Sequence, residues 1–396
     1  INLNGGDGLQ SHTQIGHGGN GLGSVKNGDI LIDNFNDLNL NGGVGAEAFA
    51  LVGHGGRSSG GNKTGDITVS AAPTASAPGA TPGTGGNLTM TSGSGLESFT
   101  QIGHGGRSSG NNKTGDIVVN NIVNATLDVG SNTDTFSQIG HGGRQSGGTK
   151  TGDVTVVASG NVRLDATGTG ANSAAQIGHG GLVSNGAIAG TTATSVNVTA
   201  GGTVDVLGGS SNNRAAMIGH GGAGSDGAKT NAGVSVTGRS VNVQGGTVNA
   251  TFAQIGSGGG RTSGNNSSTG DVTGDVSVTA TAGTISVAGG SGARSYGLIG
   301  NGGNSNPGNL TGNITVTATD NISFNGGTGT SDALAMAGHG GADSSGTKTG
   351  TINVTSSGGS VTLQGGSGGG QNNAQIGHGG DSALGVASGN ITVAAN

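Results

Sequence analysis

Eight of the nine histidines in this sequence occupy one position of a recurring phrase, Ala-Gln-Ile-Gly-His-Gly-Gly. Copies of the phrase are about 40 residues apart, and such a period is typical of solenoids and other repeat arrays. Imidazoles stacked in one row could bridge transition-metal ions, or could form a hydrogen-bonded ladder that fixes a corner of the fold. The position is held in turn by His17, His54, His104, His141, His179, His220, Ser257, Asn301, His339 and His378.

The two exceptions in this row favour the hydrogen-bonded ladder. Ser257 and Asn301 can both hydrogen-bond, but neither is a good transition-metal ligand. No carboxylate recurs beside the histidines to orient an imidazole toward a metal. We therefore expect neither a metal nor a cofactor, and keep the histidine row as the alternative metal site. A stacked row also predicts acid sensitivity, because protonated neighbours repel each other.

A second set of charged residues recurs between each histidine and the strand that follows it. This span is 12 residues long in seven of the ten copies, which predicts an arch packed on its neighbours. The aspartates could hold calcium, but the Gly-Gly-x-Gly-x-Asp nonapeptide of calcium-binding solenoids does not recur. We expect a solvated face whose aspartates accept hydrogen bonds in turns. The set comprises Arg57, Arg107 and Arg144, then Lys63, Lys113, Lys150 and Lys348, then Asp66, Asp116 and Asp153.

Three further patterns bear on function. Outward Thr, Ser and Asn side chains form an array that resembles an ice-binding face, but Val118 and Val157 interrupt it. Acidic residues recur by period and do not gather, with Asp271 and Asp275 nearest to an exception, so no coil is predicted to be an active site. By the period-2 alternation, four phenylalanine side chains are predicted to lie on the outer side of a strand. Either they are tucked under the next turn or they contact another rod. They are Phe49, Phe99, Phe136 and Phe252.

The elements that must position these residues are short strands. Each repeat holds three apolar runs with period-2 alternation and β-branched residues, bounded by Gly, Asn, Asp and Ser, as in 312–316, 322–327 and 175–179. No helical pattern is present. The sequence predicts an all-β, parallel, three-faced β-helix of about ten coils of roughly 40 residues, forming one solenoid over 1–396 with a surface insertion at about 71–86.

The predicted core is a set of rows one residue wide. One row begins Ile67, Ile117, Val154 and continues with one Val or Ile per coil, and the next begins Val69, Val119. Such narrow rows explain how 30% hydrophobic residues suffice for a chain with 94 glycines. A third row comprises Ile102, Ile139, Ile177, Ile218, Ile255 and Ile299.

Composition excludes several classes of protein. The net charge of −6 and the lack of a basic stripe argue against nucleic-acid binding. The absence of cysteine excludes disulfides, thiol catalysis and zinc sites built on cysteine. No apolar run approaches the length of a membrane span. The first and last residues would read almost as one internal copy if joined, so we expect either a longer array or stacking of chains end to end.

The phrases at 312–318, 322–329 and 175–181 resemble the repeats of filamentous-haemagglutinin-type adhesins and related β-strand-repeat surface proteins. The likeness covers essentially the whole chain. It implies a right-handed β-helix exported by a Gram-negative-type bacterium and displayed at the cell surface as a fibre.

We therefore expect a structural or adhesive extracellular rod that is not an enzyme. Its expected partners are copies of itself, end to end or side by side, and a carbohydrate or protein receptor of a host or matrix. The alternatives are a solenoid that binds or cleaves carbohydrate and, third, a filament that loads metal through the histidine row.

Overall fold

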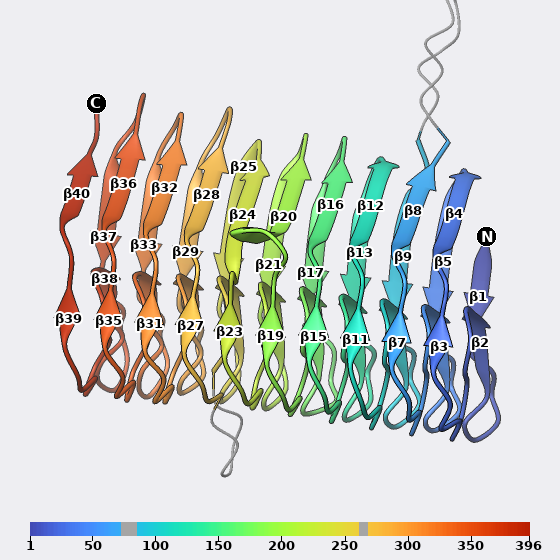
Figure 1. The fold of residues 1–396 in the computed structure, drawn as a ribbon. Coiled ribbons are helices and arrows are strands. Elements are labelled where there is room, and N and C mark those ends of the chain that lie inside the picture. The colour runs from blue at the N-terminus through green and yellow to red at the C-terminus, as the bar shows by residue number, and fades with distance from the viewer. Residues whose placement is uncertain (73–84, 261–267) are drawn as a thin grey trace, which may run out of the picture.

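The computed structural model describes residues 1–72, 85–260 and 268–396, and all regular elements in them are strands. The strands form four parallel sheets of ten strands, and each strand pairs with its counterparts in the coils before and after it. Coil 1 comprises β1–β4, coil 2 comprises β5–β8, and so on to coil 10, β37–β40. Figure 1 shows the coils side by side in a rod with the two termini at opposite ends.

Sheets A and B follow each other along every coil. Sheet A contains β1 (Asn2–Asn4), β5 (Asp37–Asn41), β9 (Asn87–Thr91), β13 (Ala125–Asp128), β17 (Val162–Asp165), β21 (Thr203–Leu207), β25 (Ser240–Gln244), β29 (Ile285–Ala288), β33 (Ile322–Asn325) and β37 (Val361–Gln364). Sheet B contains β2 (His12–Ile15), β6 (Phe49–Val52), β10 (Phe99–Ile102), β14 (Phe136–Ile139), β18 (Ala174–Ile177), β22 (Ala215–Ile218), β26 (Phe252–Ile255), β30 (Gly297–Ile299), β34 (Ala335–Ala337) and β38 (Ala374–Ile376).

Sheets C and D complete the coil. Sheet C contains β3 (Lys26–Asn27), β7 (Lys63–Thr64), β11 (Lys113–Thr114), β15 (Lys150–Thr151), β19 (Ile188–Ala189), β23 (Lys229–Thr230), β27 (Val272–Thr273), β31 (Leu310–Thr311), β35 (Lys348–Thr349) and β39 (Ala387–Ser388). Sheet D contains β4 (Ile30–Phe35), β8 (Ile67–Ala71), β12 (Ile117–Ile122), β16 (Val154–Ala158), β20 (Thr194–Ala200), β24 (Gly233–Gly238), β28 (Val276–Ala280), β32 (Ile314–Ala318), β36 (Ile352–Ser356) and β40 (Ile391–Ala394).

The predicted all-β parallel solenoid of about ten coils is confirmed. The prediction of three strands in each coil was wrong, because sheet C adds a fourth. Its strands are two residues long, as in Lys113–Thr114, so they cannot show the alternation by which a strand is recognised. The constant arch length was the signal of this sheet. Of the predicted insertion at about 71–86, residues 73–84 lie outside the described residues.

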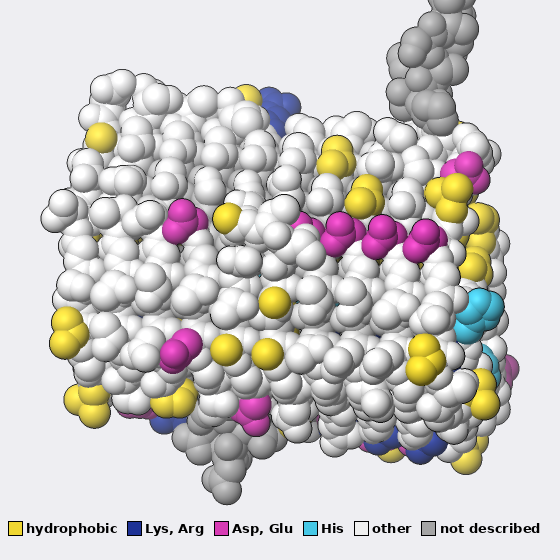
Figure 2. All heavy atoms as spheres, in the orientation of Figure 1, with side chains coloured by type: hydrophobic (Ala, Val, Ile, Leu, Met, Phe, Trp, Pro, Cys, Tyr) yellow, Lys and Arg dark blue, Asp and Glu magenta, His cyan; other side chains and the backbone are white. Residues whose placement is uncertain are grey.

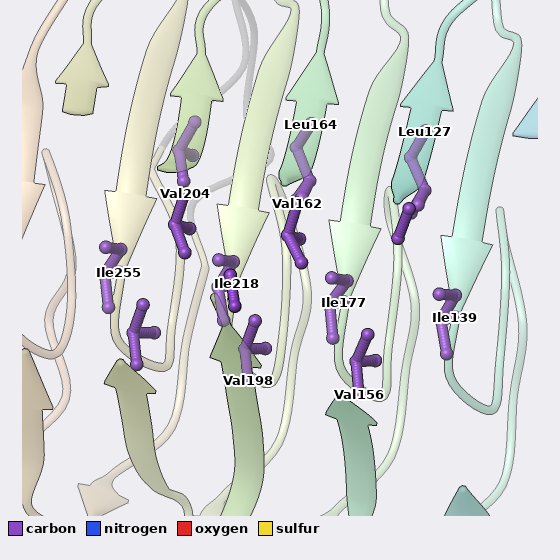
Figure 3. Packing of buried hydrophobic residues seen from close by; sticks show 14 of the residues in the cluster. Leu127, Ile139, Val156, Val162, Leu164, Ile177, Val198, Val204, Ile218 and Ile255 are labelled. Atoms are coloured by element: carbon purple, nitrogen blue, oxygen red, sulfur yellow. The ribbon is translucent and has the colours of Figure 1, made fainter. Parts of the chain in front are cut away.

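The predicted core rows are confirmed by the register of the sheets. Ile117 pairs with Ile67 on one side and with Val154 on the other, and the isoleucine row of sheet B continues from coil to coil in the same way. Figure 3 shows side chains of this core, among them Ile177, Val198 and Val204, lying between the sheets. Because every internal coil buries the same rows, stability is distributed nearly evenly along the interior of the rod.

The glycine before the histidine position is required by close stacking. At Gly103 the backbone φ is +148°, and a Cβ there would lie 2.0 Å from the carbonyl oxygen of Gly140 in the next coil. The corresponding glycines in coils 1, 2 and 4–9 meet the same obstacle. This contact explains why Gly-His recurs as a unit in the phrase.

The terminal coils differ from the internal ones in exposure. Ile391 and Val393 of coil 10 are half exposed, whereas their counterparts Ile352 and Val354 in coil 9 are buried. In the described part of the chain, no helix is long and apolar enough to cross a membrane.

Candidate functional site

The histidine row forms a column at the corner between sheets B and C. From His17 to His220 the rings of consecutive coils are stacked with centroids 4.6–5.0 Å apart. His339 and His378 form a separate stacked pair at 5.0 Å. His104, His141 and the other internal rings are buried.

Each internal imidazole ties its coil to the preceding one through both ring nitrogens. The backbone N–H of His104 donates to Nδ1 of His141 at 2.9 Å. Nε2 of His141 lies 2.8 Å from the carbonyl oxygen of Gly115. A carbonyl can only accept, so Nε2 carries the hydrogen, Nδ1 carries the lone pair, and the ring is neutral. The structure thus forms the hydrogen-bonded ladder, and a ring in it has no lone pair to offer a metal unless a bond breaks.

The two exceptions reproduce the same pair of hydrogen bonds. Ser257 Oγ accepts from the backbone N–H of His220 at 3.1 Å and donates to the carbonyl of Ala232 at 2.8 Å. Asn301 Oδ1 accepts from the backbone N–H of Ser257 at 2.9 Å, and its Nδ2 donates to the carbonyl of Gly274 at 2.6 Å. The position therefore requires one acceptor and one donor, and three residue types can supply them.

Burial keeps these histidines neutral. It holds the pKa of His104, His141 and His179 well below the usual range, helped by neighbouring histidines and lysines. Burial lowers the pKa of His220 to about 3 and, at the separate pair, that of His339 to about 4.

The lysines of the arch correct the sequence prediction. They were expected on a solvated face, but Lys63, Lys113 and Lys150 are buried, and Lys348 is 1% exposed. Each points under its arch into a cage of backbone carbonyls contributed by its own coil and the next. Around Nζ of Lys113 the carbonyl oxygens lie at 2.6–3.3 Å and belong to Ser109, Gly110, Asn111 and Gly147.

Two influences act on the charge of these ammonium groups. Burial, with the nearby lysines, lowers the pKa of Lys113 to about 6 and, with Lys229 nearby, that of Lys150 to about 7. The carbonyl dipoles of the cage favour the ammonium form, because a neutral amine would set a lone pair against an oxygen. Backbone carbonyls converge only once the chain is folded, so no side-chain pattern could reveal this cage. Ile188, Val272 and Leu310 replace the lysine with apolar side chains in coils 5, 7 and 8.

The arginines of the arch lie in a surface network with acids that the sequence analysis missed. Arg107 contacts Glu47 at 3.0 Å and Glu97 at 2.6 Å, and Arg144 contacts Glu97 at 3.4 Å and Asp134 at 3.0 Å. Each acid precedes its arginine by ten residues in coils 2–4, and this constant spacing was the available signal. The network links three consecutive coils.

The remaining predicted residues also serve coil-to-coil contacts. The backbone N–H of Asp116 donates to Oδ1 of Asp66 at 2.9 Å, so the aspartates accept turn hydrogen bonds as predicted. Asp271 and Asp275 do the same in adjacent columns and form no cluster. Phe49, Phe99, Phe136 and Phe252 are buried, the first three in one ring stack, so the tucked alternative is confirmed.

A glutamine column beside the histidines was not assigned a role by the sequence. Gln101 Nε2 donates to the carbonyl of Gly140 at 2.8 Å, and Gln138 Nε2 donates to that of Gly178 at 2.9 Å. Both side chains are buried. Within the described ranges, no group of three or more His, Asp or Glu side chains is arranged to hold a metal ion.

Two shallow troughs run along the ends of the sheet A strands. One, of 460 Å³, is lined by glycines and by Asn4, Asp7, Asn41, Thr91, Ser94 and Ser131. The other, of 500 Å³, is lined by glycines and by Leu207, Gln244, Thr247, Ser291, Asn325 and Thr328, among others. Their walls offer hydroxyl and amide groups with little charge. Figure 2 shows that uncharged polar side chains and backbone also predominate on one face of the rod.

Comparisons with protein-family models, with curated proteins and with solved structures found no match to this chain.

Proposed function

We propose that this chain is a non-catalytic structural segment of an extracellular fibre at the surface or in the matrix of a Gram-negative-type bacterium, serving to project or to adhere. The proposal is supported mainly by the hydrogen bonds that the potentially reactive side chains make between coils. His141, Lys113, Gln101 and Asp66 are each consumed in contacts that join one coil to the next. Side chains of types that could take part in catalysis therefore stabilise the stacking of coils, which gives the rod its length and stiffness.

Self-association follows from the same contacts. Each internal coil presents to the next one the donors and acceptors that its predecessor presented to it. A copy stacked on coil 10 would continue the histidine row from His378 to His17 and cover the half-exposed Ile391 and Val393. Association side by side is the other mode, and a carbohydrate or protein receptor would make the rod an adhesin.

Electron microscopy combined with single-molecule stretching tests the structural role. Ten coils predict a rod segment about 50 Å long, which lengthens into filaments on self-association. Under force the rod should unravel coil by coil, because neighbouring coils hold each other. The matched control is Val278→Pro, which removes a donor from the centre of β28 and should break the rod. Compact particles, or cleavage of polysaccharides by the pure protein, would contradict the proposal.

A second candidate, carbohydrate binding, is favoured by the two troughs. Their hydroxyl- and amide-bearing walls repeat once per coil, which suits an uncharged linear polysaccharide lying along the rod. Binding to a glycan array tests it, with Thr247→Glu inside a trough compared with Thr317→Glu on the outward side of β32. Loss of binding in the first variant alone supports the candidate, and equal binding by both variants contradicts it.

A further inference from the structure

We infer that the rod contains a segment that opens in acid, coils 2–6, next to a coil that resists acid, coil 7. Protonation of the imidazole rings in the histidine column causes the opening. This inference concerns regulation of the fold and does not depend on a fibre or adhesin role.

The geometry of the column leaves no room for an added proton. In coils 3–6, Nδ1 of each histidine accepts from the backbone N–H of the preceding coil, as between His54 and His104 at 3.0 Å. A proton on Nδ1 would face that N–H, donor against donor, and the bond would be lost. Leaving a buried N–H without an acceptor costs about 1–3 kcal/mol. The remaining bond is already made in the neutral ring: Nε2 bonds a glycine carbonyl in coils 3–5, and in coil 6 Nε2 of His220 lies 2.7 Å from Oγ of Ser195.

The charged groups around the column oppose protonation as well. Each ring is stacked between other histidines, so a second proton would sit about one ring spacing from the first. Lys63, Lys113 and Lys150 lie near His104, His141 and His179 respectively and lower their pKa by charge repulsion. Among the described residues, Asp29 raises the pKa of His54 near the start of the column, and Asp275 raises that of His339 at the separate pair, each against the larger effect of burial. The carbonyls of Gly65, Gly115 and Gly152 give the only support to the charged form of the three central rings.

Coil 7 is joined to coils 6 and 8 by residues other than histidine. Ser257 and Asn301 make the same hydrogen bonds but do not titrate in this range. Val272 and Leu310 stand where the lysines stand in other coils, and both are buried with Ala232 in a small apolar cluster. Coil 7 shares its fold with the acid-sensitive coils, so it provides an internal control in the same molecule. Coil 8 does not serve as a control, because its backbone N–H at Asn301 donates to Nδ1 of His339 in coil 9 at 3.1 Å.

The direction of the effect follows from linkage. The folded-state pKa of these histidines is below the ordinary value near 6.5, so the unfolded coil binds more protons than the folded coil. The stability of coils 2–6 is therefore complete above about pH 6.5 and falls as the pH is lowered toward the folded-state pKa, about 3 for His220.

Hydrogen exchange read by mass spectrometry at pH 7.5 and pH 5 tests this inference on the full chain, with labelling times scaled for the intrinsic rates. Peptides of coils 2–6 should lose at least about tenfold in protection at pH 5, the factor expected for one pKa unit, while those of coil 7 keep theirs. Equal behaviour of the two segments would overturn the inference. The variant His141→Asn, which copies Asn301, should restore protection around coil 4 at pH 5, and a lack of restoration would also count against it. If that variant fails to fold, titration of the native histidines by NMR decides: rings that take up protons in folded coils without loss of protection would refute the inference.

Discussion

Coils 2–4 and coils 7–8 share one backbone but differ in the side chains that hold it. In coils 2–4 the corner is a stack of imidazoles, the arch is filled by caged lysines, and the surface carries an arginine–carboxylate network. In coils 7–8 a hydroxyl and an amide take the corner and Val272 and Leu310 fill the arch. The two regions show that the solenoid specifies a donor, an acceptor and a filled volume at each position, and leaves the residue type open.

The lysine cage should be the most sensitive position. Lys113→Ala removes the hydrogen-bond donor from the carbonyls of Ser109, Asn111 and Gly147 and opens a cavity, so we expect a loss of about 3–5 kcal/mol. Lys113→Leu, which copies Leu310, should cost clearly less because it fills the space. Local unfolding free energies from hydrogen exchange at neutral pH measure both. Equal costs for the two variants would show that packing is not what coils 7–8 use in place of the cage.

The corner should tolerate a polar replacement and reject an apolar one. His141→Ala leaves the backbone N–H of His104 and the carbonyl of Gly115 without partners, so we expect a loss of about 2–3 kcal/mol. His141→Asn should cost less than about 1 kcal/mol at neutral pH, because an asparagine makes both bonds in coil 8. Thermal denaturation at pH 7.5 compares the two variants. If they were equally unstable, stacking of the rings would outweigh the hydrogen bonds.

A histidine placed in the resistant segment should transfer the acid response. In Ser257→His the new ring can stack on His220 and accept the same backbone N–H. At pH 7.5 we expect a change of less than about 1 kcal/mol, and at pH 5 a loss of protection in coil 7, because burial lowers the folded pKa of such a ring. Hydrogen exchange at both pH values checks this. Full protection of coil 7 at pH 5 would contradict the proposal that a buried histidine ring makes its coil sensitive to acid.

The surface network should contribute least. Arg107→Gln removes the bridge between Glu47 and Glu97, and we expect a loss of about 1 kcal/mol or less, shrinking as salt is added. Arg294→Gln is the matched control, because Arg294 is more exposed and its contact to Asp332 is 3.8 Å. Denaturation at low and high ionic strength measures both. An Arg107 effect that does not change with salt would point to packing of the side-chain stem.

The parts of this structure that were predictable from sequence are those that depend on local alternation and exact repetition. The rows through Ile117, Val119 and Ile139 follow from period-2 runs that recur in register. The burial of Lys113 could not be predicted from the sequence, because its partners are backbone carbonyls, which every residue has. For the same reason, the sequence could not predict that Gln101 donates to a backbone carbonyl. The partners of Arg107 were within reach, since their ten-residue spacing is as regular as the histidine period.

The coil-to-coil register bears on how such a rod can evolve. Because every internal coil presents the same strand pairing and an equivalent donor and acceptor to its neighbours, an in-frame duplication or deletion of one repeat keeps the backbone contacts of the rod. Each such event would change the length of the rod by about 4.8 Å and leave its cross-section intact. Reach can therefore be adjusted by unequal recombination between copies, one unit at a time, without a compensating substitution anywhere in the chain.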